Sequence, residues 1–377
     1  MLPDRSPGMP TVPVRVVVVD DSPLVRRLLC AILDADPRIA VVATASDPLE
    51  ARVAIKDTDP DVVTLDIEMP HMDGLSFLEK IMTLRPTPVV MISSLTQERA
   101  DVTLRALEMG AVDFVPKPTV DLRNGLEELA REITDKVVHA ASAKRRLAQR
   151  AFGGGVGACG AGGYGAGHVP CRPAPLGFAA SNAVVAIGAS TGGVEALREI
   201  IVTLPPDMPA TLVTVHMPMA YTARFAARLD AMSAVRVKEA EQGERLRAGH
   251  VYVAPGGRHL ELAHEGGAYL CRLHEGDKVQ GHRPSVDVLF RSVAAAAGRR
   301  GIGVILTGMG RDGAEGLKRM REEGARTIGQ DERSCVVYGM PRIARETGAV
   351  EQEVPLSRIT ATLVGLLAQH APKQPHL

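Results

Sequence analysis

Apolar and polar positions alternate along the first part of the chain in a pattern that predicts strands followed by helices. Short apolar runs of strand length are each followed by a segment with helical spacing, and these runs are Val14–Val19, Ile39–Ala43, Val62–Ile67, Val89–Ile92 and Phe114–Val115. Ser22 suits an N-cap and Pro23 suits the first helical position, so we expect the first helix to begin there. Strands that alternate with helices pair in parallel, and the pattern therefore predicts an α/β domain with a doubly wound five-stranded parallel sheet.

The middle of the chain lacks this pattern. Residues 151–176 read AFGGGVGACGAGGYGAGHVPCRPAPL, in which Gly, Ala and Pro dominate and apolar periodicity disappears. This composition cannot build a core, so we expect a flexible linker over residues 145–182. The resulting division is an N-terminal tail (1–13), a first domain (14–144), the linker (145–182), a second domain (183–371) and a C-terminal tail (372–377).

Composition and charge narrow the class of protein. The 377 residues suffice for two domains with separate cores, and Lys plus Arg equal Asp plus Glu at 44 each. Because there is no basic excess, we expect no nucleic-acid partner. The five cysteines form no Cys-x-x-Cys pair, and neither a signal peptide nor an apolar span of ~18 residues is present. We therefore expect a cytoplasmic protein that is not inserted in a membrane.

Polar residues stand at the ends of four strands of the first domain. Along the chain they are Asp20 and Asp21, then Asp66 in LDIEMPHMDG, Ser93, and Lys117 in DFVPKP. The carboxyl ends of parallel strands meet at one edge of a sheet, where three carboxylates form an oxygen-rich site that suits Mg²⁺. A lysine and a hydroxyl opposite them would contact a phosphoryl group. A single acid such as Asp20 would be an ordinary solvent-facing residue, so the prediction depends on the whole set.

This set resembles the response-regulator receiver family over residues 14 to about 140. The resemblance implies a flavodoxin-like fold, phosphorylation of Asp66, and Mg²⁺ as a cofactor for that phosphorylation. The metal ligands that it implies are Asp20, Asp21 and Asp66. The switch residues and the phosphoryl contact that it implies are Ser93, Phe114 and Lys117. Pro116 is less usual at its place in the family and indicates that the fifth strand ends early.

The second domain opens with VVAIGASTGGVEAL, residues 184–197, in which a small-residue turn interrupts an apolar run. Such a turn either binds a phosphate or presents a nucleophilic serine. A dinucleotide site requires Gly-x-Gly-x-x-Gly, but Ser190 stands at the middle glycine, and the next strand ends in His216 instead of an acid. The letters also fit Gly-x-Ser-x-Gly, which places a serine on a sharp strand-to-helix turn.

A nucleophilic serine needs a base and a residue that orients the base. ATLVTVHMP places His216 at the end of an apolar strand, and GIGVILTGMGRDG places Asp312 just past another. Taken alone, each residue fits a helix cap or a hydrogen-bonded structural position. Their joint placement predicts a Ser190–His216–Asp312 triad, and the order Ser…His…Asp indicates a fold other than the α/β-hydrolase fold.

The remaining histidines of the second domain show no ligand spacing. We therefore expect surface or loop residues and no metal site at His250, His259, His264, His274 and His282.

The domain order together with GASTGG, HMP, GHVYVAPGGRHL, GHRPSVDVLF and TGMGRDG resembles the chemotaxis protein-glutamate methylesterase family over nearly the whole chain. The resemblance implies a second α/β domain with a mainly parallel sheet, in which Ser190 is the nucleophile, His216 the base and Asp312 the orienting acid. Backbone N–H groups of Thr191 and Met309 are candidate oxyanion donors.

The same resemblance implies an activity and its partners. Glutamate methyl esters on methyl-accepting chemoreceptors would be hydrolysed and receptor glutamines deamidated, without a cofactor for the esterase reaction. A chemotaxis histidine kinase would supply the phosphoryl group. The residues by themselves leave two alternatives open, a receiver-regulated esterase for small molecules and a non-catalytic module that binds a nucleotide.

Overall fold

The computed structural model describes residues 12–69, 74–94, 97–118, 126–144, 147, 174–177 and 182–370. The chain divides into two compact units, Met1–Val156 and Gly157–Leu377. Most of the linker expected over 145–182, and most of the two tails, lie outside the described residues. Among the helices that the structure describes, none combines the length and the apolar character needed to cross a bilayer.

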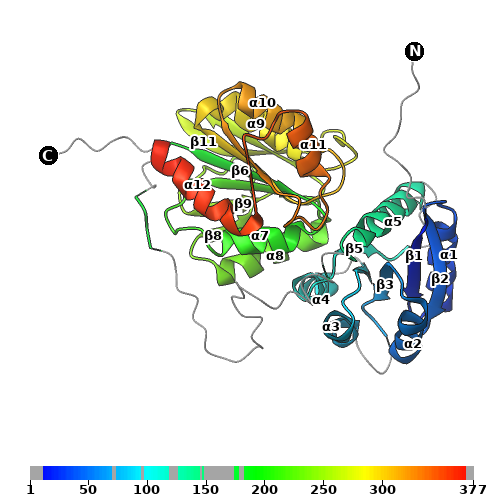
Figure 1. Cartoon of the computed structure of the whole chain (residues 1–377). Coiled ribbons are helices and arrows are strands. Elements are labelled where there is room, and N and C mark those ends of the chain that lie inside the picture. The colour runs from blue at the N-terminus through cyan, green and yellow to red at the C-terminus, as the bar shows by residue number, and fades with distance from the viewer. Residues whose placement is uncertain are drawn as a thin grey trace, which may run out of the picture. The chain divides into compact units, whose positions relative to one another are not determined.

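The first unit alternates strands and helices as the sequence predicts. Its elements are β1 (Val14–Val19), α1 (Pro23–Asp34), β2 (Ile39–Ala45), α2 (Pro48–Thr58), β3 (Val62–Asp66), α3 (Gly74–Leu84), β4 (Val89–Ser93), α4 (Gln97–Glu108), β5 (Asp113–Pro116) and α5 (Leu126–Ala141). The strands form one sheet in the order β2-β1-β3-β4-β5, in which every pairing is parallel. Helices surround this sheet (Figure 1), so the predicted doubly wound parallel sheet is confirmed.

Local sequence explains where two of these elements begin and end. The hydroxyl of Ser22 accepts the N–H of Val25 at 3.4 Å, and α1 starts at Pro23 as expected. The fifth strand, which Pro116 was expected to end early, has four residues and includes Pro116 as its last one. β5 is the edge strand of the sheet, where a residue without an N–H group interrupts no ladder on its open side.

The second unit contains a larger sheet and a hairpin. Its elements are β6 (Val184–Ala189), α7 (Gly193–Ile201), β7 (Thr211–Val215), α8 (Met219–Met232), β8 (Arg236–Glu239), β9 (His250–Val253), β10 (His259–Glu265), β11 (Ala268–His274), α9 (Val286–Ala297), η2 (Gly298–Arg300), β12 (Gly301–Ile305), α10 (Ala314–Glu322), β13 (Arg326–Gln330), α11 (Met340–Glu346), β14 (Gln352–Val354) and α12 (Leu356–His370). Seven strands pair in parallel in the order β14-β13-β12-β6-β7-β9-β8, and β10 pairs with β11 in an antiparallel hairpin. The predicted α/β domain with a mainly parallel sheet is confirmed.

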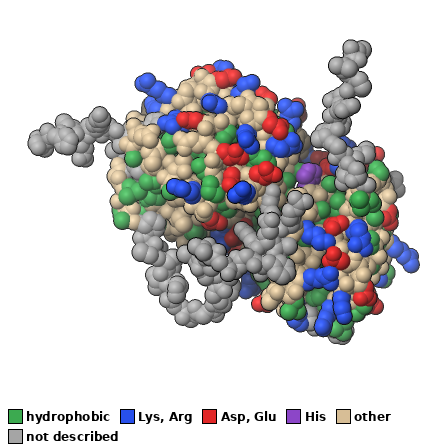
Figure 2. Space-filling view, viewed as in Figure 1, with side chains coloured by type: hydrophobic (Ala, Val, Ile, Leu, Met, Phe, Trp, Pro, Cys, Tyr) green, Lys and Arg blue, Asp and Glu red, His purple; other side chains and the backbone are tan. Residues whose placement is uncertain are grey.

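Helices lie on both faces of the larger sheet, α9, α10 and α11 on one side and α7, α8 and α12 on the other (Figure 1). Every residue of the central strands β12, β6 and β7 is buried, as expected for parallel strands that are covered on both faces. On the face seen in Figure 2, Lys and Arg intermix with Asp and Glu over the second unit, in keeping with the balanced composition.

The contact between β6 and α9 requires a glycine. A Cβ atom on Gly188 would lie 2.1 Å from Cγ1 of Val286, the first residue of α9. Val286 is fully buried, so it has no open space into which it could move. Gly188 therefore sets how closely α9 approaches the strand that carries Ser190.

We expect Gly188→Ala to lower the free energy of unfolding by about 1–3 kcal/mol, because the added methyl overpacks this contact. Gly365 is the matched control: it is exposed in α12, and nothing lies within 4 Å of a Cβ built there. Gly365→Ala should instead raise the free energy of unfolding, by up to about 1 kcal/mol, through helix propensity. Urea unfolding of both variants measures the change in the free energy of unfolding. Equal changes in the two variants would contradict the packing explanation.

Candidate functional site

The three residues of the predicted triad come from three adjacent strands. Ser190 directly follows β6, His216 directly follows β7, and Asp312 lies in the loop between β12 and α10. β6 lies between β12 and β7 in the sheet, and the three strands are parallel. Their carboxyl ends therefore bring the three side chains to one edge of the sheet.

Ser190 is held in a tight strand-to-helix turn. Its N–H donates to the carbonyl of Thr307 at 3.1 Å, and its own carbonyl accepts the N–H of Gly193 at 2.7 Å. Gly192 has a φ of 74°, which favours glycine, and a Cβ there would lie 2.5 Å from Cβ of Val336. These glycines turn the chain at once from β6 into α7 and leave the serine at the strand end.

His216 bridges the other two residues. Its Nδ1 lies 3.0 Å from Oγ of Ser190, and its Nε2 lies 2.8 Å from Oδ2 of Asp312. In a neutral ring this network favours the proton on Nε2 and leaves Nδ1 as the acceptor for the serine hydroxyl. The two nitrogens thus have the reverse of the roles they take in the chymotrypsin triad, although the chain of hydrogen bonds is the same.

Asp312 is buried at the N-terminus of α9. Oδ1 accepts the hydroxyl of Ser285 at 2.7 Å and the N–H of Asp287 at 2.9 Å, while Oδ2 accepts the N–H of Val286 at 2.7 Å. Burial raises the pKa of Asp312, but the hydrogen bonds from His216, Asp287 and Ser285 outweigh it and hold that pKa below its ordinary value. The carboxylate is therefore ionised next to the histidine.

Ser285 was not among the residues predicted from the sequence. The signal was a serine directly before a helical apolar pattern, in PSVDVLF, which is typical of an N-cap. What the pattern does not reveal is that its hydroxyl bonds to the acid of another loop instead of to its own helix.

The two candidate oxyanion donors lie in loops beside Ser190. Thr191 follows it directly and is buried. Met309 follows Gly308, where a Cβ would lie 2.8 Å from Cβ of Ser190, so the loop after β12 passes very close to the serine. In the part of the chain that the structure describes, the N–H of Met309 donates no hydrogen bond. Both placements suit donors that face a reacting carbonyl, and their role remains a proposal.

One histidine of the second unit, His259, differs from the expectation of surface or loop residues, whereas His282 lies in the loop between β11 and α9 as expected. His259 is fully buried: its Nε2 lies 3.0 Å from the carbonyl oxygen of Asp277, and its Nδ1 accepts the N–H of Ser285 at 3.2 Å. His282 stacks on His216, with ring centroids 3.6 Å apart and an angle of 12° between the planes. The spacing of histidines along a sequence carries no information on their stacking or burial.

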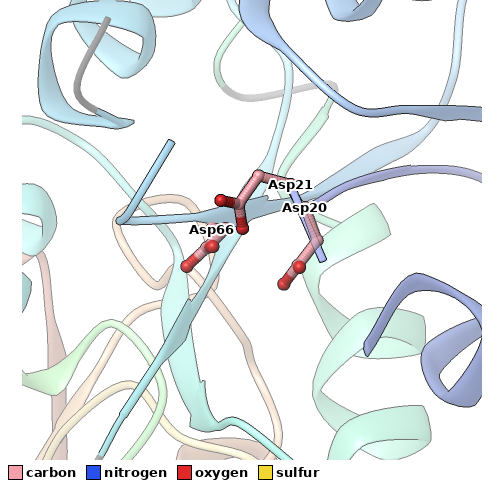
Figure 3. Close-up of side chains that lie close together, drawn as sticks. All are labelled: Asp20, Asp21 and Asp66. Carbon is pink, nitrogen blue, oxygen red and sulfur yellow. The ribbon is translucent and has the colours of Figure 1, made fainter. Parts of the chain in front are cut away.

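The first unit brings its three predicted acids together. Oxygen atoms of Asp20, Asp21 and Asp66 lie within 4.8 Å of one another at the ends of β1 and β3 (Figure 3). Lys117 contacts two of them, with Nζ 2.7 Å from Oδ2 of Asp66 and 3.7 Å from Oδ2 of Asp20. Among the described residues, Oδ2 of Asp20 accepts no hydrogen bond although it is buried.

The electrostatics of this pocket favour an added cation. Burial and then the repulsion from Asp66 raise the pKa of Asp20 to about 6. Burial raises the pKa of Asp66 to about 6 as well, against the opposing hydrogen bond from Lys117. One lysine does not offset three carboxylates, and an all-oxygen donor set with a buried oxygen that accepts no hydrogen bond among the described residues fits a hard divalent cation such as Mg²⁺.

The two predicted switch residues are buried on β4 and β5. The hydroxyl of Ser93 lies 2.8 Å from that of Thr103, which projects from α4. Phe114 is 3% exposed, and Nζ of Lys136 donates to its carbonyl at 2.7 Å. Thr103 and Lys136 were not predicted from the sequence, because neither residue lies at a strand end.

The first unit is thus a receiver-like α/β domain with an acidic pocket, and the second is a parallel α/β domain with a Ser–His–Asp hydrogen-bond chain. Together they define a response regulator with an output domain of the serine-hydrolase kind. The family models for CheB methylesterase and for the response regulator receiver domain match residues 185–363 and 16–130 respectively.

Similar proteins cover nearly the whole chain. The protein-glutamate methylesterase/protein-glutamine glutaminase of Bordetella bronchiseptica is 52% identical over 352 residues, which are 93% of this chain and 96% of that protein. A protein of the same name, numbered 1, from Geobacter metallireducens is 50% identical over 369 residues, 95% of this chain and 97% of its own. The crystal structure of the Thermotoga maritima CheB methylesterase catalytic domain is 40% identical, with 49% of this chain and 99% of that chain covered and a TM-score of 0.49. The chain belongs to the protein-glutamate methylesterase/protein-glutamine glutaminase family.

The lowered pKa of Asp312 predicts an acid-dependent loss of stability. A carboxyl whose pKa is lower in the folded than in the unfolded state stabilises the fold above pH about 4, and this contribution is lost as the pH falls toward the lower, folded value. Asp312→Asn removes the titration. Between pH 5 and pH 3, we expect wild type to lose on the order of 1 kcal/mol more free energy of unfolding than the variant. Urea unfolding at each pH measures the difference, and a steeper loss in the variant would contradict the assignment.

Proposed function

We propose that this protein is a phosphorylation-regulated esterase of the cytoplasm, which removes methyl groups from glutamate methyl esters on chemoreceptors and deamidates receptor glutamines. One observation carries the proposal: His216 lies within hydrogen-bond distance of both Ser190 and the buried, ionised Asp312. The names of the relatives at 50–52% identity supply the substrate class.

The geometry gives each residue a step in ester hydrolysis. Oγ of Ser190 attacks the γ-carbonyl of the methylated glutamate while Nδ1 of His216 takes the hydroxyl proton. The same nitrogen returns the proton to the departing methoxide, which leaves as methanol. A water molecule, deprotonated by His216, then releases the free glutamate and restores Ser190. Asp312 stays ionised and stabilises the imidazolium that forms twice in this cycle.

Deamidation follows the same path with a different leaving group. A glutamine side chain presents a carbonyl of the same geometry, and the proton from His216 goes to the amide nitrogen, which leaves as ammonia. In both reactions the carbonyl oxygen becomes negative, and the N–H groups of Thr191 and Met309 are the proposed donors to it. Each such donor is typically worth about 3 kcal/mol in the transition state.

The first unit would control this chemistry through Asp66. A chemotaxis histidine kinase is the proposed phosphoryl donor, and Asp20, Asp21 and Asp66 would hold the Mg²⁺ that phosphotransfer uses. The metal, when bound, neutralises charge on phosphoryl oxygens. Lys117, already 2.7 Å from Asp66, would contact the phosphoryl group, while Ser93 and Phe114 would respond to it. On phosphorylation, the hydroxyl of Ser93 would give up its hydrogen bond with the hydroxyl of Thr103 and donate one to a phosphoryl oxygen instead.

The triad assignment predicts strongly non-additive losses of activity. Ser190→Ala and His216→Ala should each lower kcat for methanol release by about 10³-fold or more, and the double variant should lose little beyond either single one. Release of methanol from a methylated chemoreceptor is the measurement. His264→Ala, a change at an exposed histidine outside the site, should keep the wild-type rate.

Two results would contradict the proposal. A folded Ser190→Ala protein that still releases methanol would remove the nucleophile assignment. A wild-type protein that hydrolyses small esters but leaves methylated receptor intact would favour the small-molecule esterase, because the same triad would then act on another substrate.

The phosphoacceptor assignment predicts metal-dependent labelling of one residue. Acetyl phosphate with Mg²⁺ should phosphorylate the wild-type protein and accelerate methanol release, and a chelator should prevent both. Asp66→Asn should not be labelled and should stay at the unstimulated rate. Asp57→Asn, which changes an exposed acid of α2, is the control and should behave as wild type. Intact-protein mass spectrometry detects the label, and equal labelling of Asp66→Asn would refute the assignment.

A further inference from the structure

The ring of His282 lies flat against the ring of His216. The centroids are 3.6 Å apart and the planes differ by only 12°. We infer that His282 is a positioning residue for the base: its ring fixes the orientation of His216 and stabilises the positive charge that His216 acquires in each proton transfer. The inference rests on the proposed function, because it assigns His282 a role only if His216 is the base.

The base needs such support because its own torsion does not fix it. The χ2 torsion of histidine is broad and roughly two-fold, so a rotation of about 180° is compatible with its covalent geometry. The hydrogen bonds to Ser190 and Asp312 lie in the plane of the ring and act at its two nitrogens. The ring of His282 lies at stacking distance from one face of His216, where no hydrogen bond acts, and it blocks the rotation of His216 on that side.

The ring of His282 is itself held by a tight turn. Val279 and His282 exchange two backbone hydrogen bonds, of 3.0 and 2.9 Å. The two residues between them, Gln280 and Gly281, both have positive φ, 53° and 81°. This is the pattern of a type I′ turn, which requires positive φ at both central residues. The stacking surface is therefore presented by a fixed backbone.

The chain that follows His282 also fixes the acid of the triad. Ser285, three residues on, donates its N–H to the buried His259 at 3.2 Å and its hydroxyl to Asp312 at 2.7 Å. The short segment His282–Asp287 thus contacts both His216 and Asp312. The ring of His282 stacks on His216, and the first N–H groups of α9 bind Asp312.

The stack also affects the charge of the reacting base. His216 is 9% exposed, so the imidazolium that forms there has little contact with water. Asp312 compensates this charge in the plane of the ring, and the π face of His282 lies against the ring from one side. An aromatic face stabilises a desolvated cation that lies over it. Removing the ring would expose that face of His216 and weaken the stabilisation.

The test uses the full chain and three substitutions at one position. His282→Ala and His282→Gln remove the aromatic face, and His282→Phe keeps a flat ring but no ring nitrogen. We expect the first two to lower kcat for methanol release about 10-fold with KM nearly unchanged, and His282→Phe to stay within about threefold of wild type. Thermal unfolding of each variant checks the fold, and His282→Gln stands in if His282→Ala does not fold.

A fluorophosphonate probe separates failure of this inference from failure of the proposed function. Wild type should be labelled at Ser190 and Ser190→Ala should not, while His282→Ala should be labelled more slowly in proportion to its loss of kcat. A wild-type protein that is not labelled would overturn the proposed function and this inference together. An active wild type with unchanged kcat in His282→Ala, or a His282→Phe variant as slow as His282→Ala, would overturn the inference alone.

Discussion

The buried carboxylate of Asp312 at the start of α9 is the interaction on which the catalytic unit depends. An ionised acid that is 1% exposed is stable only where donors replace water, and four donors meet it here: the ring of His216, the hydroxyl of Ser285, and the N–H groups of Val286 and Asp287. The helix N-terminus adds its partial positive charge. The pKa of the acid falls as a result, and the ionised acid holds the ring of His216 through Nε2.

The arrangement is reciprocal between two helices. Asp312 stands just before α10 and accepts hydrogen bonds from the start of α9, while Asp287, in the first turn of α9, accepts the N–H of Gly316 in α10 at 2.7 Å. The acid at the start of each helix thus accepts backbone N–H groups from the first turn of the other helix, which have no partner within their own helix. A Cβ on Gly316 would lie 2.9 Å from the carbonyl oxygen of Asp287, so the exchange also requires close packing. Asp312 is thereby fixed by the packing of two helices and not by its loop alone.

In each unit the candidate site lies at the carboxyl ends of that unit's own parallel strands, but the pKa values of the aspartates shift in opposite directions. In the receiver, burial dominates and raises the pKa of Asp20 and Asp66 to about 6, because one lysine and few donors face several acids. In the catalytic unit, donors dominate and the pKa of Asp312 is lowered. The first pocket thus suits an added cation and a phosphoryl group. In the second, hydrogen-bond donors already surround the carboxylate.

The strands of the first unit, and in the second unit the strands before Ser190, His216 and Asp312, could be predicted from apolar runs in the sequence, because such runs specify a parallel sheet and a parallel sheet gathers its carboxyl ends. Ser190, His216, Asp312 and the acids of the receiver could therefore be predicted. The tertiary structure alone decided what completes each site. The hydroxyl of Ser285 and the ring of His282 contact residues far along the chain, and Thr103 of α4 contacts Ser93. Such contacts have no period or spacing in the sequence, since they arise only when separate elements pack against one another.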